Sequence, residues 1–166
     1  MSKNFEEELI EQVSETKFPL KKLNRKKILV TGCNGFIPSA FIKILAGMMK
    51  INGYKIHFYG IARQNSKKRK NILKSLIKEK VIKILNLDIN KEFKINKPID
   101  YCLHGASTTA PKKYLSNPTD VILPNSLGLI NILKSMENKR LKKFIFLSSS
   151  EVYGNFSSLY KKKKSF

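Results

Sequence analysis

The chain alternates short, continuous apolar runs with longer segments in which apolar residues recur at helical spacing. The apolar runs predict β-strands at 27–31, 54–62, 81–85, 99–104 and 143–148, and the helical spacing predicts helices at 36–51, 71–80 and 118–138. Continuous apolar strands are typical of a parallel sheet that is buried on both faces. The alternation therefore predicts an α/β fold, a doubly wound, Rossmann-like parallel sheet with strand order 3-2-1-4-5.

The chain is predicted to have three parts. Residues 1–24 form an amphipathic helix and a linker, because Phe5, Leu9, Ile10 and Val13 share one helical face that can pack on the domain or on a partner. Residues 25–154 form the α/β domain. Residues 155–166 show neither periodicity and are predicted to be a disordered basic tail. Within the long helix, Pro124 is expected to cause a kink.

The first strand runs directly into Gly32-x-x-Gly35, which is followed by a helix. Gly32 permits a tight turn, and Gly35 allows the backbone to approach a pyrophosphate closely. The N-terminus of the following helix offers unpaired N–H donors and the positive end of its dipole. The segment Thr31–Ile37 is therefore predicted to bind the phosphates of a dinucleotide at the carboxyl ends of the strands.

The net charge of the chain is +21, which by itself suggests a nucleic-acid partner. The basic residues are 29 lysines and only 4 arginines, whereas base and phosphate readers rely on the bidentate arginine fork. Lysine-rich solvated faces are thus the favoured explanation, and nucleic acid is not the expected partner. A nucleotide-linked, acidic substrate would also benefit from this charge.

The cysteines, Cys33 and Cys102, fit neither a zinc site nor a C-x-x-C redox motif, so no metal is expected. A reducing, cytoplasmic location is the simplest interpretation. The acidic N-terminus lacks the apolar segment of a signal peptide. No apolar stretch is long enough to cross a membrane, so no membrane association is expected.

The sequence VTGCNGFIPS resembles the V-T-G-x-x-G-F-I-G-S signature of extended short-chain dehydrogenases/reductases, the NAD-dependent epimerase/dehydratase group that acts on nucleotide sugars. The resemblance extends over about residues 26–154, through the D-x-x-x-H-x-A-[AS], N-x-x-G and S-[ST]-x-E-V-Y-G segments. Pro38 departs from the signature, because it replaces the third glycine. It is tolerated in a first helical turn but adds bulk beside the cofactor.

The resemblance implies that 25–154 is an NAD(P)-binding domain. Arg63 stands where NAD-selective sites usually carry an acid, which allows NADP. NAD is nevertheless the expected cofactor, because similar sequences with Ala-x-Arg resemble NAD users. Asp88 would approach the adenine, and His104 would be structural and cofactor-adjacent. The implied cofactor-binding residues are Gly32, Asn34, Gly35, Phe36, Ile37, Arg63, Asp88, His104, Gly105, Ala106, Ser107, Asn125 and Ser148.

The resemblance also implies a catalytic hydroxyl at Ser149, which would hydrogen-bond the sugar hydroxyl that is oxidised. In the family a Tyr-x-x-x-Lys pair removes the proton. Tyr160 and Lys164 have this spacing, but Tyr160 follows Ser149 by only about eleven residues. Four consecutive lysines would satisfy any spacing rule, so this pair is doubtful.

The leading interpretation is the NAD(P)-binding, N-terminal portion of a nucleotide-sugar epimerase, dehydratase or decarboxylase, C-terminally truncated and inactive alone. The alternative is a non-catalytic dinucleotide-binding or interaction domain, and a basic nucleic-acid-binding protein is a less favoured third. An exposed sheet edge is expected to cause poor solubility or self-association into a homo-oligomer.

Overall fold

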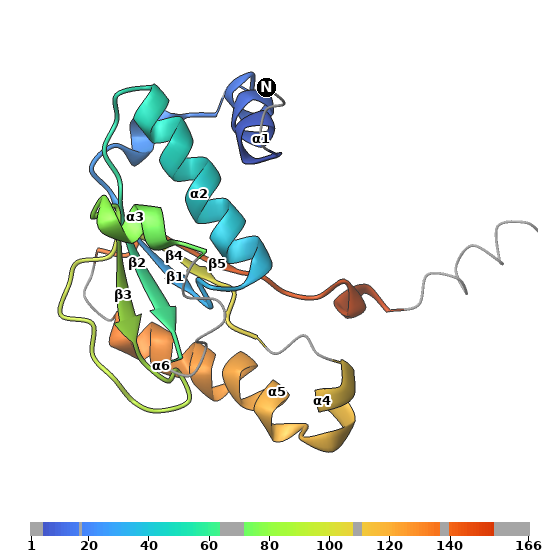
Figure 1. The fold of residues 1–166 in the computed structure, drawn as a ribbon. Coiled ribbons are helices and arrows are strands. Elements are labelled where there is room, and N and C mark those ends of the chain that lie inside the picture. The colour runs from blue at the N-terminus through green and yellow to red at the C-terminus, as the bar shows by residue number, and fades with distance from the viewer. Residues whose placement is uncertain (1–4, 17, 64–71, 108–110, 137–139, 155–166) are drawn as a thin grey trace, which may run out of the picture.

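The computed structural model describes residues 5–16, 18–63, 72–107, 111–136 and 140–154. Its elements follow one another in the alternating order that the sequence predicts (Figure 1). They are α1 (Phe5–Ser14), η1 (Leu20–Leu23), β1 (Lys27–Thr31), α2 (Phe36–Ile51), β2 (His57–Ala62), α3 (Lys74–Lys78), β3 (Ile82–Asn86), β4 (Tyr101–His104), α4 (Pro111–Ser116), α5 (Thr119–Asn125), α6 (Leu127–Ser135), β5 (Lys143–Phe146) and η3 (Ser150–Tyr153).

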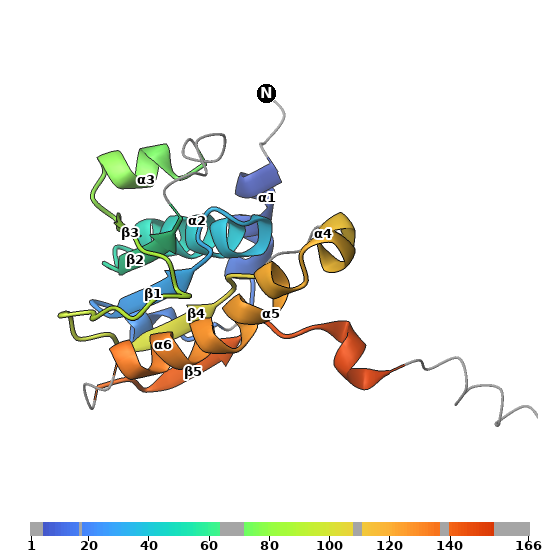
Figure 2. The same cartoon turned by 90° about the horizontal axis from the view of Figure 1, so that it is seen from below.

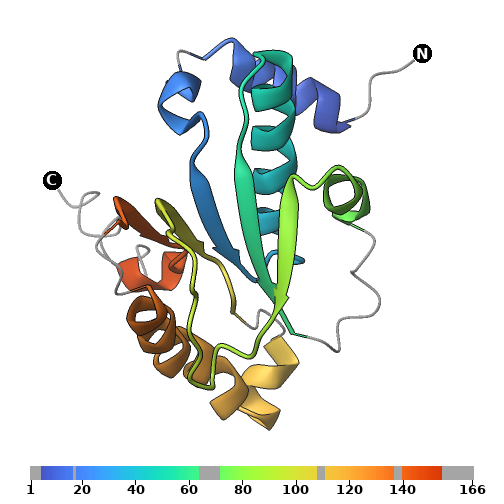
Figure 3. The same ribbon diagram turned by 90° about the vertical axis from the view of Figure 1, so that its left-hand side faces the viewer.

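The five strands form one parallel sheet in the order β3-β2-β1-β4-β5, which confirms the predicted topology. β1 is central: Lys27 pairs with His57 of β2, and Thr31 pairs with His104 of β4. Figure 3 shows β1, β2 and β3 side by side with their arrows pointing the same way. Because the chain order reverses between β1 and β4, the switch point lies at their carboxyl ends.

The sheet has a separate apolar core on each face, because successive side chains of a strand point to opposite sides. On one face Ile28 and Val30 pack with the buried side of α2, including Ile42 and Leu45. On the other face Leu29 packs with Ile132 of α6 and with residues of the β3–β4 connection. Figure 2 shows α2 on one side of the sheet and α5 and α6 on the other.

The N-terminal helix α1 packs on α2, where a Cβ atom placed on Gly47 would lie 2.5 Å from the Ile10 side chain. Ile10 and Val13 are half-buried against the core that α2 forms. The predicted amphipathic helix therefore forms, and it covers this chain's own domain.

Several predicted element bounds were wrong. The helix predicted at 118–138 is two helices, α5 and α6, with a break at Ser126 (φ −115°, ψ −80°). Pro124 lacks the N–H that would continue the helix, and the expected kink is a full interruption two residues later, at Ser126. β2 begins at His57 rather than 54, and α3 is shorter than its predicted span, of which residue 71 lies outside the described residues. The short helix α4 was not predicted.

Candidate functional site

The end of β1 passes so close to the turn after β4 that only glycine fits there. Gly32 has φ +63°, and a Cβ atom on it would lie 2.8 Å from both the Ala106 Cα and the Gly105 carbonyl oxygen. The N–H of Gly35 donates to the Gly32 carbonyl at 2.7 Å and closes the loop. The predicted role of Gly32 as the residue of the tight turn is confirmed by this geometry.

The N-terminal end of α2 points its backbone donors into this loop. Gly35 is the N-cap, with no side-chain cap, and its carbonyl accepts the Ser39 N–H at 3.0 Å. Phe36 and Ile37 are exposed. Because they lie in the first turn of α2, their N–H groups have no helix carbonyl to donate to. Pro38 has no N–H, so the N–H groups that this end of α2 could offer to an anion are those of Phe36 and Ile37.

Five of the predicted cofactor residues come together in one cavity of about 110 Å³ at the carboxyl ends of the strands. They are Gly32, Arg63, Asp88, Ala106 and Ser107. These residues come from four separate segments, and the cavity that they line lies at the switch point where an open α/β sheet binds its ligand. We call this space the switch-point cavity.

Asp88 is exposed at the switch-point cavity and holds the turn after β3. Its carboxylate accepts the Asn90 N–H at 3.0 Å, and its carbonyl accepts the Lys91 N–H at 3.1 Å. Asp88 is thus a turn aspartate that also lines the cavity. Its hydrogen bonds within the turn explain its conformation without the predicted contact to the adenine.

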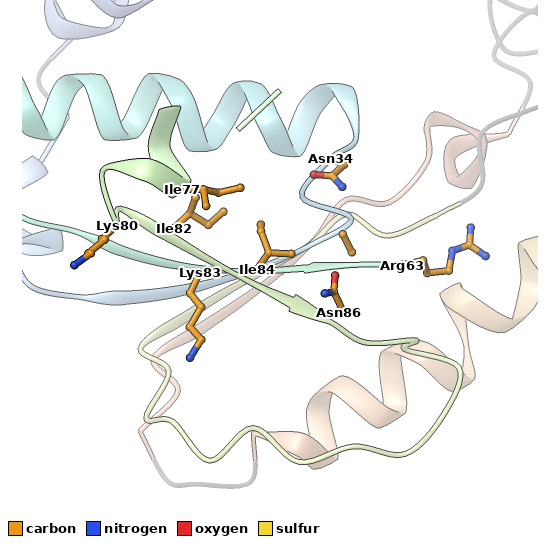
Figure 4. Close-up of a pocket in the computed structure, with 9 residues that line it drawn as sticks. Asn34, Arg63, Ile77, Lys80, Ile82, Lys83, Ile84 and Asn86 are labelled. Atoms are coloured by element: carbon orange, nitrogen blue, oxygen red, sulfur yellow. The ribbon is translucent and has the colours of Figure 1, made fainter. Parts of the chain in front are cut away.

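A second cavity of about 590 Å³ adjoins the first and shares Ala62 and Arg63 with it. It runs along β3 beneath α3, over an isoleucine floor, and we call it the β3 cavity (Figure 4). Asn34 of the phosphate loop lines this cavity and not the switch-point cavity. Lys80 and Lys83 also line it, and sequence reasoning missed both because lysine is common throughout the chain.

His104 lies behind the site and does not line either cavity. It is fully buried, and Thr31 Oγ1 lies 2.7 Å from its Nδ1. Thr31 Oγ1 also accepts the N–H groups of Gly105 and Ala106, both at 3.1 Å, so its own proton goes to Nδ1. The ring is therefore the Nε2–H tautomer, and it ties β1 to the small-residue turn.

The imidazole of His104 is held neutral. Burial lowers its pKa below 6.5, and the Pro124 backbone carbonyl raises it to a smaller extent. Nε2 has no hydrogen-bond partner of normal geometry among the described residues. Its ring stacks on Phe146 at a centroid distance of 5.3 Å. His104 thus makes packing and hydrogen-bond contacts within the fold, and its place beside a cofactor stays a prediction.

Asn125 is attached to the cavity wall through Ser107. Its Nδ2 donates to Ser107 Oγ at 3.0 Å and to the Val121 carbonyl at 2.7 Å. Pro124, beside it, lines the switch-point cavity, a role that sequence reasoning missed because the docking of α5 on the end of β4 is a tertiary contact. Pro124 thus lines the cavity directly, and Asn125 contacts it through Ser107.

The predicted catalytic segment follows β5 on the surface. Ser148 and Ser149 are exposed, and the Ser149 carbonyl accepts the Val152 N–H at 3.3 Å. Neither serine lines the switch-point cavity or the β3 cavity. Tyr160 and Lys164 lie outside the described residues.

The described residues contain no cluster of three or more His, Cys, Asp or Glu side chains that could hold a metal. Within the same part of the chain, no helix is long and apolar enough to cross a membrane.

A family model described as the NAD dependent epimerase/dehydratase family matches residues 28–165. The bifunctional polymyxin resistance protein ArnA of Wigglesworthia glossinidia brevipalpis is 34% identical over 135 residues, which are 79% of this chain and 19% of that protein. UDP-glucuronic acid decarboxylase 1 of Xenopus tropicalis is 26% identical over 92% of this chain and 34% of that protein. The chain thus spans about a third or less of the length of these two curated relatives.

Solved structures share the fold. The UDP-Glc/GlcNAc 4-epimerase of Campylobacter jejuni superposes with a TM-score of 0.59 at 20% identity, over 78% of this chain and 39% of that one. The UDP-glucose 4-epimerase of Bifidobacterium longum, solved in complex with NAD+ and UDP, gives 0.54 at 23% identity, over 78% and 38%. At these identities the likeness concerns the fold.

Proposed function

This chain belongs to the NAD dependent epimerase/dehydratase family, and we propose on that basis that residues 25–154 bind a nicotinamide adenine dinucleotide for a nucleotide-sugar epimerase, dehydratase or decarboxylase. The observation that carries the proposal is the switch-point cavity, in which residues predicted from four distant segments of the sequence meet. Such convergence is what dinucleotide binding requires, because the ligand crosses the ends of several strands.

The residues present fit such a cofactor. The absence of a side chain at Gly32 lets the phosphate loop pack directly against the backbone of Gly105 and Ala106, and the Phe36 and Ile37 amides at the α2 N-terminus favour a pyrophosphate. Ala106 and Ser107 line the cavity with small side chains, and Asn125 donates a hydrogen bond to the Ser107 hydroxyl. When bound, the nicotinamide supplies hydride acceptance and return.

For catalysis we assign to Ser149 the hydrogen bond to the sugar hydroxyl, a role that rests on the family resemblance. Ser149 is exposed and lies beyond the carboxyl end of β5, after Leu147 and Ser148. We expect no turnover from the 166-residue chain alone, because a nearby tyrosine–lysine pair is needed to remove the hydroxyl proton. The Tyr160–Lys164 pair stands too close to Ser149 in sequence to supply it.

A second candidate is a non-catalytic dinucleotide-binding domain. It is favoured by the position of Ser149, which does not line the switch-point cavity. Both candidates share cofactor binding, so a turnover assay with UDP- and dTDP-sugars separates them. Sugar oxidation by the chain alone would exclude the second candidate.

Isothermal titration of the full chain with NAD+, NADP+ and duplex DNA tests the dinucleotide proposal. Micromolar binding of a dinucleotide, with no DNA binding at physiological salt, is expected. DNA binding without dinucleotide binding would replace the proposal by a nucleic-acid function. We further propose a cytoplasmic location and a self-associating chain, the latter tested by sedimentation.

A further inference from the structure

We propose that the edge of the sheet opposite the switch-point cavity binds an anionic lipid surface. The exposed basic residues at this edge come from three segments, and each segment leads into or begins β1, β2 or β5. We call these residues the amino-edge face: Lys21, Lys22, Arg25, Lys55, Arg140, Lys142 and Lys143. The inference goes beyond the proposed dinucleotide binding, because it concerns the other end of the strands.

Backbone hydrogen bonds hold the three segments side by side. The Arg25 N–H donates to the Lys55 carbonyl at 2.6 Å. Farther along the edge, the Asp100 N–H donates to the Lys27 carbonyl at 2.9 Å, and the Asp100 carbonyl accepts the Lys142 N–H at 2.8 Å. Figure 3 shows η1 and the C-terminal end of α2 at this same end of the sheet, where the β1 and β2 arrows begin. The basic residues thus lie along one continuous edge.

The acid within this edge does not neutralise the amino-edge face. Asp100 is 1% exposed, and its Oδ1 lies 3.5 Å from the Arg140 Nε. Its Oδ2 accepts the Lys27 N–H at 2.9 Å. No Asp or Glu occurs between Glu15 and Glu79, so η1, the start of β1 and the turn before β2 carry basic residues without acids. The face therefore presents seven exposed basic residues to solvent with no exposed acid in the segments that form it.

Two exposed apolar side chains accompany the basic residues. Phe18 is 47% exposed shortly before η1, and Ile51 is 71% exposed at the end of α2, shortly before Lys55. An anionic bilayer suits both kinds of group, because its lipid phosphates attract cations and its interface accepts apolar side chains. Nucleic-acid readers rely instead on arginine, whereas five of the seven residues of the face are lysines. Binding at a lipid surface requires no helix that crosses the membrane.

The acids of α1 indicate how the molecule would face the bilayer. Glu8 and Glu11 are exposed on α1, which packs on α2 beside Gly47. An anionic surface repels these carboxylates, so the side of the edge formed by η1, β1 and β5 should approach it while α1 tilts away. The switch-point cavity lies at the opposite ends of the strands and would stay open to a dinucleotide.

The test is cosedimentation of the full chain with two kinds of vesicle at about 0.15 M salt, one of phosphatidylcholine alone and one containing roughly one third phosphatidylglycerol. The test variant combines Lys55→Glu with Lys142→Glu. The matched control combines Lys74→Glu with Lys91→Glu, which are exposed and lie outside the amino-edge face. Each reversal changes the net charge by two, so both double variants carry +17 instead of +21. Circular dichroism verifies that both fold.

The expected result is binding to the anionic vesicles and not to phosphatidylcholine alone. A basic residue near an anionic surface strengthens binding by about fivefold, so the test variant should bind about twentyfold or more weakly and the control less than about threefold more weakly. Equal losses in the two variants, or equal binding to both kinds of vesicle, would overturn the inference. Failure to bind anionic vesicles would also overturn it and leave the dinucleotide proposal standing, because titration with NAD+ tests that proposal separately.

The apolar contribution separates a lipid surface from a nucleic acid. Ile51→Ser should weaken binding to the anionic vesicles by about threefold or more, because the side chain no longer enters the interface. Ile130→Ser is the matched control, since Ile130 is 49% exposed on α6, away from this edge. Equal binding by the two variants would overturn the apolar part of the proposal. Duplex DNA binding that the Lys55→Glu, Lys142→Glu variant loses, with no binding to vesicles, would assign the face to nucleic acid instead.

Discussion

Pro38 occupies the space that a side chain on Gly105 would need: a Cβ atom placed on Gly105 would lie 2.7 Å from the Pro38 Cγ. Pro38 is buried in the first turn of α2, and Gly105 follows β4. The bulk that replaces the third glycine of the family signature is therefore accommodated by a glycine across the loop. This pairing explains how the helix can dock on the sheet despite the proline.

Gly105→Ala should lower the free energy of unfolding by roughly 1 to 3 kcal/mol, because the added methyl group meets the rigid proline ring. The cost should shrink when Pro38→Ala is introduced into the same chain, since the ring that clashes is then gone. Urea denaturation of the two single variants and the double variant measures the coupling. Additive effects in the double variant would show that the two residues do not share this space.

The sequence predicted β1 and α2 with the bounds that the structure has, because glycines mark the loop between them and each element has a clear apolar pattern. α4 was missed because its segment, PKKYLS, has too few apolar residues to show a helical period. The sequence placed a kink at Pro124, whereas Pro124 is still helical and the break comes two residues later, at Ser126.

The candidate site was predicted in part, for a related reason. Gly32, Arg63 and Asp88 each follow a strand, so topology alone brings them to one edge of the sheet. Pro124 and Lys83 could not be predicted in the same way, since their places depend on how α5 docks and on how little of β3 is covered by the short α3. Local patterns predict elements, whereas these contacts arise from packing between elements.

Gly32→Ala should abolish dinucleotide binding and lower the free energy of unfolding by about 3 kcal/mol. The cost combines left-handed backbone strain with a backbone clash at 2.8 Å. Gly53→Ala is the matched control, because Gly53 has a similar φ of +68° and no atom within 4 Å of the added Cβ. It should lose only roughly 1 to 2 kcal/mol and keep dinucleotide binding. Equal losses in both variants, measured by urea denaturation, would mean that the close approach at Gly32 contributes nothing.

Protonation of His104 should destabilise the fold in mildly acidic solution. Burial lowers the pKa of His104 in the folded state below 6.5, so the unfolded chain binds the proton more readily. Stability is then unaffected by this group above pH 6.5 and falls as the pH drops below 6.5 toward the folded pKa. The slope is at most about 1.4 kcal/mol per pH unit. Urea denaturation between about pH 7.5 and about pH 5, a range that spans the ordinary histidine pKa, measures this slope.

The second histidine of the chain provides the control for this prediction. His57→Gln alters an exposed side chain and should keep the pH dependence. His104→Phe should flatten it and should also lower the free energy of unfolding at neutral pH, because Thr31 loses the acceptor of its hydroxyl proton. A slope that persists in His104→Phe would assign the pH dependence to other groups.

β5, an edge strand of the sheet that the described residues form, should drive association between copies of the chain. β5 lies at one end of the sheet, and Ile145 and Phe146 on it are 53% and 39% exposed, whereas the edge strand β3 at the other end carries the exposed Lys83. An apolar edge strand favours pairing with another chain, and a charged one opposes it. Ile145→Lys should therefore weaken self-association by about tenfold in sedimentation velocity at physiological salt, where the net charge of +21 is screened.

Ile51→Lys is the matched control, because Ile51 is 71% exposed at the far end of α2. If both variants weaken association equally, added charge and not the β5 edge is responsible.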